Sequence, residues 1–277
     1  MKEFFGFGGY ERIPEGYFSW QHLTFVTSLM LIMIALGIFF GLKMRKRSEK
    51  DKTKVLIFAA ISIDLLEIFK IVMISLANKD PMHWLNELPL FMCSIQLITI
   101  PLCAFSKGRL REATLDFVAI FGLLGAFMGT YFAGQNYACY PVLSVDNVIS
   151  GLTHSTSGFT ALYIIISGLI SMKKNNITIT FLIITSFCLM AYVANIAIDY
   201  NYMFLMRGDG TPYDILYNLV GGNALLYPLG VLGLFLLYIC IFYWVYYFCT
   251  KQKKKEFVDI KSNSGLEEEE KETASVS

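Results

Sequence analysis

Apolar residues recur along the chain in long runs that are separated by short polar connections. A helix needs about 20 such residues to cross the hydrocarbon core of a bilayer. Because lipid offers no hydrogen bonds to the backbone, a segment in the core must satisfy its own polar groups, as a helix does. The pattern therefore predicts an all-α, polytopic membrane protein, a bundle of seven transmembrane helices at residues 20–42, 55–77, 88–105, 113–133, 148–171, 178–198 and 219–248.

The last run is the longest and its beginning is the hardest to place. At 1.5 Å per residue it would be about 45 Å long, which exceeds the thickness of a bilayer core. Pro228, with Gly221, Gly222 and Gly230 beside it, is expected to kink or to start this helix.

Lysine and arginine gather in alternate connections between the apolar runs. Residues 43–54, 107–111, 173–174 and 251–255 hold most of them, whereas the intervening connections hold only Lys79 and Arg207. The positive-inside rule then places the N-terminus outside and the C-terminus in the cytoplasm. Residues 1–19 are accordingly expected to form an extracellular segment, residues 20–248 the membrane domain, and residues 249–277 a disordered, acidic cytoplasmic tail.

Composition agrees with a membrane location and excludes other classes. Hydrophobic residues make up 55% of the chain and charged residues 16%, whereas soluble proteins are about 25% charged. A net charge of +1 gives no field that would attract nucleic acid. The six cysteines are scattered without a C-x-x-C pair, so no metal and no other cofactor is expected. We predict a multi-pass protein of the cell membrane whose chemistry takes place inside the bundle.

Ionisable residues inside a span are costly and usually face an interior cavity or pathway. The second span holds Asp64, Glu67 and Lys70, which lie on one face because they are spaced three residues apart. Two interpretations stay open: Glu67 and Lys70 form an ion pair that fixes helix packing, or they take part in function. The fourth span carries a stripe of small residues, Gly122, Ala126, Gly129 and Ala133, which is typical of close helix packing without further function.

Polar side chains on four spans lie at a common depth. Asn195, Asp199 and Tyr202 belong to one stripe down the sixth span, and the fifth span presents His154 on a face of small residues. In the predicted orientation, five residues lie within about 10 Å of the outer boundary; they are His22, Cys93, His154, Asn195 and Asp199. Structural polar groups need not agree in depth, so this layer predicts one cavity that opens toward the outer leaflet.

Three strings carry a family resemblance: LPLFMC at residues 88–93, LTHS at 152–155 and NYMFL at 201–205. In order and spacing, and over residues from about 18 to 248, they resemble the YwaF-type bacterial integral membrane proteins. That family is similar to the animal transmembrane protein 164 group of phospholipid acyltransferases, which implies a membrane cysteine as nucleophile. The motifs place the cysteine at Cys93 and a histidine at His154. One position departs, since the family's histidine two residues before the cysteine is Phe91 here.

The layer and the resemblance together predict an acyltransferase or transacylase that acts on phospholipid or other lipid esters. Cys93 would attack the ester and His154 would take and return the proton. The supporting or substrate-binding residues would be Asn195, Asp199, His22, Glu67, Lys70 and Tyr202. The expected partner is a membrane lipid, as substrate; the sequence does not define the oligomeric state.

Two other functions stay open. A transporter or channel for a small polar solute would use Glu67, Lys70 and Asp199 to line its pathway. A non-enzymatic membrane scaffold would need no polar layer at all.

Overall fold

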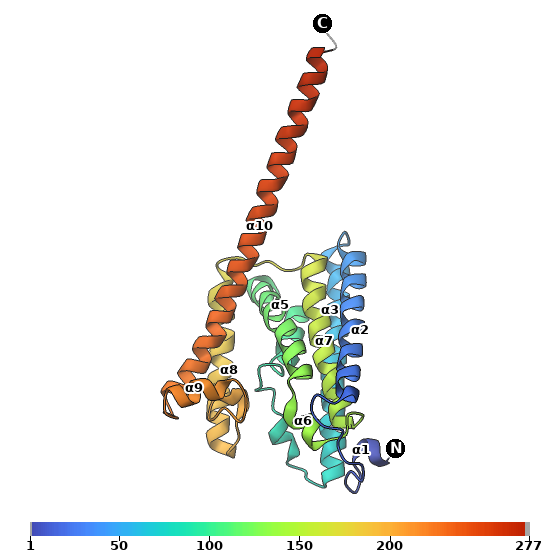
Figure 1. Cartoon of the computed structure of the whole chain (residues 1–277), viewed down its shortest axis with the longest axis vertical. Helices are drawn as coiled ribbons and strands as arrows, with labels where there is room; N and C mark the ends of the chain where they lie inside the picture. The colour runs from blue at the N-terminus through green and yellow to red at the C-terminus, as the bar shows by residue number, and fades with distance from the viewer. Residues whose placement is uncertain (1, 275–277) are drawn as a thin grey trace.

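A computed structural model describes the backbone of residues 2–274 and the side chains of residues 4–250. In the described residues the chain is all-helical, without a β-strand (Figure 1). The helices are α1 (Lys2–Phe5), α2 (Trp20–Met44), α3 (Glu49–Asn78), α4 (Gln96–Phe105), α5 (Gly108–Tyr131), α6 (Gly134–Cys139), α7 (Val145–Ser167), α8 (Asn176–Ile198), α9 (Tyr213–Leu219) and α10 (Leu226–Ala274). Two 3-10 turns, η1 (His83–Glu87) and η2 (Tyr202–Phe204), lie between them.

Four helical segments in the described part are long and apolar enough to cross a membrane: Trp20–Met44, Gly108–Cys139, Asn176–Ile198 and Leu226–Thr250. The prediction of a helical membrane protein is therefore confirmed. The count of seven spans and the orientation of the termini stay predictions.

Serine caps start three of the long helices. The hydroxyls of Ser19, Ser48 and Ser144 each accept a hydrogen bond from the backbone N–H three residues later, which satisfies one of the free donors of a helix N-terminus. These polar caps therefore fix where each of the three helices begins.

The third predicted span is corrected by the structure. Helix α4 begins only at Gln96, so residues 88–95 are irregular rather than helical. Pro89 disfavours helical backbone at Leu88 and supplies no N–H. Instead of a helix, this segment forms turns, in which the Leu90 N–H donates to the Leu88 carbonyl and the Ile95 N–H to the Phe91 carbonyl. Irregular backbone at membrane depth is tolerated where protein buries it or where it lines a cavity.

The last span also begins later than predicted, at Leu226. Gly221 and Gly222 have φ of 62° and 67°, left-handed values that break the chain between α9 and α10. The side chain of Asn223 then accepts hydrogen bonds from Leu225 N–H and Leu226 N–H and starts α10. The sequence predicted that this Gly- and Pro-containing stretch either kinks the last helix or starts it. In the structure it starts the helix.

Beyond residue 248 the backbone continues α10 as far as Ala274, where the sequence predicted a disordered tail. This part of the helix projects away from the bundle (Figure 1). Isolated helices are marginal in water, so disorder of this segment in solution stays a prediction.

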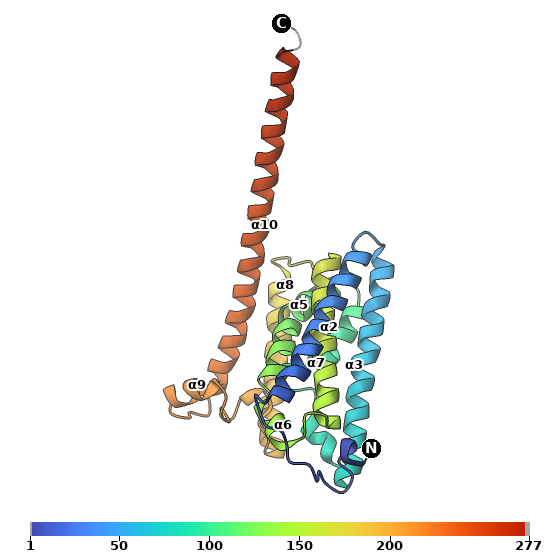
Figure 2. The ribbon, with the colours of Figure 1, turned by 45° about the vertical axis from the view of Figure 1, so that its right-hand side comes forward.

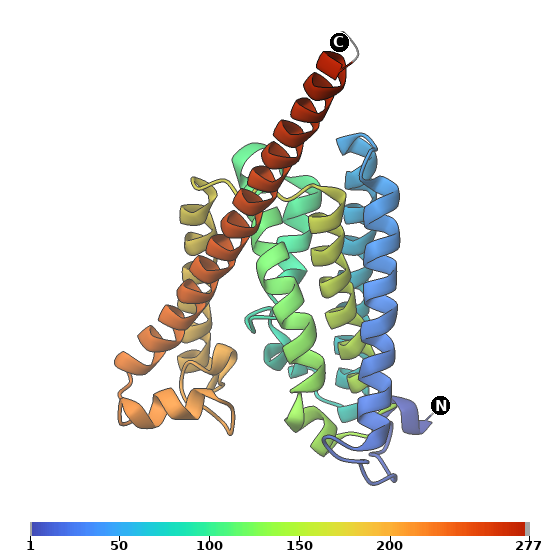
Figure 3. The same cartoon turned by 45° about the horizontal axis from the view of Figure 1, so that its top comes forward.

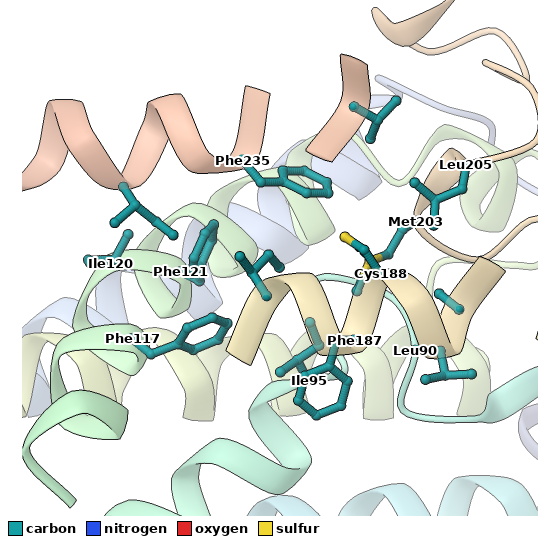
Figure 4. Close-up of a cluster of buried hydrophobic side chains, with 14 of the residues drawn as sticks. Leu90, Ile95, Phe117, Ile120, Phe121, Phe187, Cys188, Met203, Leu205 and Phe235 are labelled. Atoms are coloured by element: carbon teal, nitrogen blue, oxygen red, sulfur yellow. The ribbon is translucent and has the colours of Figure 1, made fainter. Parts of the chain in front are cut away.

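Helix α5 lies between two groups of helices (Figures 2 and 3). On one side, α2 and α3 both pack on α7, which in turn packs on α5. On the other side, α8 packs on α5 and α10 packs on α8. Figure 4 shows the apolar core of that second side, where Phe117 and Phe121 of α5 meet Phe187 of α8 and Phe235 of α10.

The stripe of small residues on α5 provides the close packing that the sequence predicted. A Cβ on Gly122 would lie 2.9 Å from the Cβ of Ala161, and a Cβ on Gly158 would lie 2.7 Å from that of Ala126. Helices α5 and α7 therefore approach each other closely, as small-residue faces allow.

A buried carboxylate ties the loop after α7 to the bundle. Asp116 of α5 accepts hydrogen bonds from the backbone N–H groups of Ser171 and Met172 and from the side chains of Asn176 and Tyr243. Side chains from three helices and one loop thus meet at a fully buried charge. Such a charge is tolerated when hydrogen bonds surround it.

Candidate functional site

Cys93 lies in the irregular segment 88–95, directly before α4. It is partly exposed, whereas Cys103 and Cys188 are buried in apolar clusters. Its Sγ lies 4.0 Å from the Ser94 hydroxyl. The residue Cys93 is therefore less enclosed than the other two.

The first turn of α4 follows Cys93 closely. The backbone N–H of Gln96 donates to the Cys93 carbonyl at 3.3 Å, and the next three N–H groups of the helix donate to the carbonyls of Ser94 and Ile95. The Gln96 side chain is fully buried, and its Nε2 has no hydrogen-bond partner among the described residues. A buried N–H without a partner is costly, and this one belongs to a residue three positions after Cys93.

His154 and Cys93 pack against the same face of α5. A Cβ on Gly129 would lie 2.2 Å from Cε1 of the His154 ring, and a Cβ on Gly125 would lie 3.6 Å from the Cβ of Cys93. Residues four apart are neighbours on a helix surface. The two side chains are thus brought within about one helical turn of each other along α5.

Among the described residues there is no hydrogen bond between the Cys93 thiol and the His154 imidazole. The predicted separation of their side chains, within about 6 Å, stays a prediction. Catalytic contacts are often longer before substrate binds, and both residues are partly exposed.

Glu67 and Lys70 form the ion pair that the spacing on α3 suggested, with 2.7 Å between Nζ and Oε1. Lys70 also binds Glu87 of η1, at 2.8 Å. This cluster of three charges holds the start of the irregular segment against α3.

Outside the spans, Glu87 and His83 shift each other's proton affinity. Burial alone would raise the pKa of Glu87, but the charge of Lys70, its hydrogen bond to the carboxylate and the nearby His83 ring lower it to about 2. The Glu87 carboxylate, 3.6 Å from Nε2 of His83, raises the pKa of that imidazole above 6.5. Glu87 is therefore ionised at neutral pH and keeps its bond to Lys70.

His22 is buried and joins α2 to α5. Its Nε2 lies 3.1 Å from the carbonyl oxygen of Thr130, and its Nδ1 accepts from the Phe18 N–H at 3.2 Å. The ring also lies 3.8 Å, between centroids, from Tyr137. Because Thr130 follows Gly129, His22 lies beside the turn that holds His154, with its own nitrogens already occupied.

Asn195 and Tyr202 hold each other. The Asn195 amide donates to the Tyr202 carbonyl at 3.0 Å and accepts from the Tyr202 N–H at 2.6 Å, while the Tyr202 hydroxyl donates to the Leu85 carbonyl. Phe91 packs on Tyr202 with ring centroids 5.1 Å apart. These contacts hold α8 and η2 against the segment that carries Cys93. Phe91, which stands where the family has a histidine, therefore packs against an aromatic ring.

Asp199 is placed differently. It ends α8 with a left-handed φ of 52° and is exposed. The structure thus sets Cys93 and His154 over one face of α5. It ties Lys70 to Glu87 and Tyr202 to Phe91, close in sequence to Cys93, and it leaves Asp199 at the surface.

The similarity to known proteins can now be compared with this geometry. A model of the TMEM164 family matches residues 17–246, which is most of the chain and includes every residue of the site. The chain belongs to the TMEM164 family. The resemblance to the transmembrane protein 164 group is confirmed. No curated protein and no solved structure matches the chain.

Four residues of this TMEM164-family site or its frame were not singled out as functional from sequence. Glu87 and Asp116 are acidic residues next to or inside apolar runs, and that signal could have marked them. Gln96 is polar within the third run. The prediction that Gly129 serves helix packing is correct, but the sequence did not show that its neighbour is His154.

Proposed function

We propose that this TMEM164-family protein is a multi-pass enzyme of the cell membrane that transfers acyl groups from phospholipid or other lipid esters. The observation that supports the proposal most directly is that Cys93 and His154 lie on one face of α5, over Gly125 and Gly129. A nucleophile and a base on rigid elements, with some access to the site, are what covalent acyl transfer needs.

In the proposed reaction, His154 takes the proton of the Cys93 thiol as sulfur attacks the ester carbonyl. The tetrahedral adduct collapses to a thioester on Cys93, and the lyso-lipid leaves as an alcohol with the proton returned by His154. An acceptor hydroxyl then attacks the thioester, loses its proton to His154 and takes the acyl group, while sulfur leaves as the thiol. With water as acceptor, the same residues would act as an esterase.

Two neighbouring features support particular steps. The unpartnered Gln96 side-chain amide, three residues after Cys93, is a donor suited to the negative charge that develops on the carbonyl oxygen. The Glu67–Lys70–Glu87 cluster holds the segment that presents Cys93. Asn195 and Tyr202 act as positioning residues through Phe91, and the orientation predicted from sequence would place the reaction on the outer-leaflet side.

The test is acyl exchange in vesicles that contain the purified protein, a phospholipid labelled in its acyl chain and an unlabelled lyso-lipid acceptor. Wild type should move the label and leave an acyl adduct on Cys93 in mass spectra. Cys93→Ser should remove the thioester, and His154→Ala should slow transfer by about 10²-fold or more, the usual contribution of a general base. Cys240→Ser, at an exposed thiol on α10, is the matched control and should retain activity.

If all four proteins fold and move the label equally, Cys93 does not carry out acyl transfer. The charged residues of α3 would then be tested for a role in transport. Flux of small polar solutes into the same vesicles, which should tolerate Cys93→Ser, is the measurement for that function.

A further inference from the structure

A long groove on another face of the bundle lies between α2 and α3, with α7 as its floor. Its volume is about 770 Å³, within the range of small-molecule sites. On α2 it extends from Leu29 to Met44, about 22 Å at 1.5 Å per residue. This exceeds the half-thickness of a bilayer core, about 15 Å, so the groove could hold an acyl chain along its full length.

The groove is separate from the Cys93 site. On α7 it is lined by Leu152, Ser155, Thr156 and Phe159, a stripe at helical spacing. His154 is directed instead at Gly129 of α5. Whatever occupies the groove would therefore not meet the proposed nucleophile directly.

One end of the groove is basic and the rest is apolar. Lys43, Arg47 and Lys54 line that end together with a single carboxylate, Asp51. Asp51 binds Lys54 at 2.8 Å and accepts from the Ser48 hydroxyl, while Lys43 lies over the Phe39 ring at 5.5 Å. Among the residues whose side chains are described, Lys43 and Arg47 have no acidic partner, so the end of the groove carries an excess of positive charge.

We propose that this groove binds one anionic phospholipid, with the phosphate held by Lys43, Arg47 and Lys54 and an acyl chain along the apolar wall. The charge asymmetry argues for this occupant. A second protein helix would need no cluster of cations at one end, and a zwitterionic lipid would gain less from it. Basic residues at the end of a span attract anionic headgroups, about fivefold in binding for each cation.

The test measures lipid carried by the full chain after reconstitution with equal amounts of phosphatidylglycerol and phosphatidylcholine of the same acyl chains. Native mass spectrometry should find one phosphatidylglycerol retained in preference to phosphatidylcholine. Replacing Lys43, Arg47 and Lys54 together by Gln should reduce that preference at least about tenfold. The matched control replaces Lys46, Lys50 and Lys52 by Gln, which removes the same charge from the same turn but not from the groove lining, and it should stay within about twofold of wild type.

A second variant keeps the charge and fills the space. Ser62 lines the groove on α3, and Ser62→Phe should lower retention of the lipid while the cations stay in place. Equal loss in both triple variants would mean diffuse attraction to the surface and would overturn the proposal. So would equal retention of the two lipids by wild type, or a dimer that Ser62→Phe dissociates, since a second copy would then be the occupant.

Discussion

The imidazole of His154 packs directly against α5 at Gly129, where a Cβ would be 2.2 Å from its Cε1. No side chain other than hydrogen fits between the ring and the helix. The position of the proposed base therefore depends on a residue that carries no chemistry of its own.

Gly129→Ala should displace His154 and cost about 1–3 kcal/mol of stability, the usual effect of overpacking. Acyl transfer should fall with it. Gly125→Ala is the matched control, because its Cβ would meet Cys93 at an ordinary 3.6 Å and alanine favours the helix. Thermal unfolding in detergent and acyl exchange measure both effects; equal behaviour of the two variants would contradict the close contact with His154.

Cys93 should react with N-ethylmaleimide near neutral pH faster than Cys103 or Cys188, which are buried. If His154 assists ionisation of the thiol, His154→Ala should slow modification of Cys93 several-fold. Peptide mass spectrometry reads each site in one sample, and the exposed Cys139 is an internal control that should be unchanged. An unchanged modification rate at Cys93 in His154→Ala would mean that the histidine does not assist ionisation of the thiol.

Stability should fall in acid through Glu87. Its pKa is about 2 in the folded protein and 4.5 ordinarily, so its contribution is present above pH 4.5 and is lost as the pH falls toward 2. The contribution is at most about 3 kcal/mol. His83, with a raised pKa, contributes below pH 6.5 and loses its contribution as the pH rises through its folded pKa.

Unfolding between pH 7 and pH 3 should therefore be less pH-dependent in Glu87→Gln than in wild type. Glu112→Gln removes a carboxylate whose partner, Lys173, is largely exposed, and it should keep the wild-type slope. If both variants keep that slope, the Lys70 cluster does not control acid stability.

Asp116→Ala should destabilise the protein by about 3–5 kcal/mol, as does removal of one partner from other buried polar networks. The change leaves the N–H groups of Ser171 and Met172 and the side chains of Asn176 and Tyr243 without their acceptor. Asp199→Ala, at an exposed carboxylate, should change the unfolding temperature little. A small effect at Asp116 would mean that water replaces the carboxylate.

The predicted orientation can be read with a membrane-impermeant maleimide on intact cells. Cys139 is exposed and should be labelled from outside. In a Cys139→Ser background, a cysteine at position 46 in the basic turn should be labelled only after permeabilisation. Reversed labelling would place the Cys93 site on the cytoplasmic side.

The sequence by itself determined the class of this protein. Apolar runs of membrane length specify helices because lipid leaves the backbone no other partner, and the strings around Cys93 and His154 are sufficient to indicate the family. The i, i+3 spacing of Glu67 and Lys70 made their ion pair one of two open interpretations, since neighbours on a helix surface are set by its geometry.

Tertiary structure decided what lies between the helices. The break before Gln96 interrupts an apolar run that hydropathy reads as continuous, and the bundle can hold that irregular backbone because neighbouring helices surround it. Glu87 reaches Lys70, and His154 reaches Gly129, across 17 and 25 residues of chain. Contacts of that range depend on how helices pack, which a pattern along a single helix does not encode; for the same reason Asp199, on the right stripe by spacing, lies at the surface.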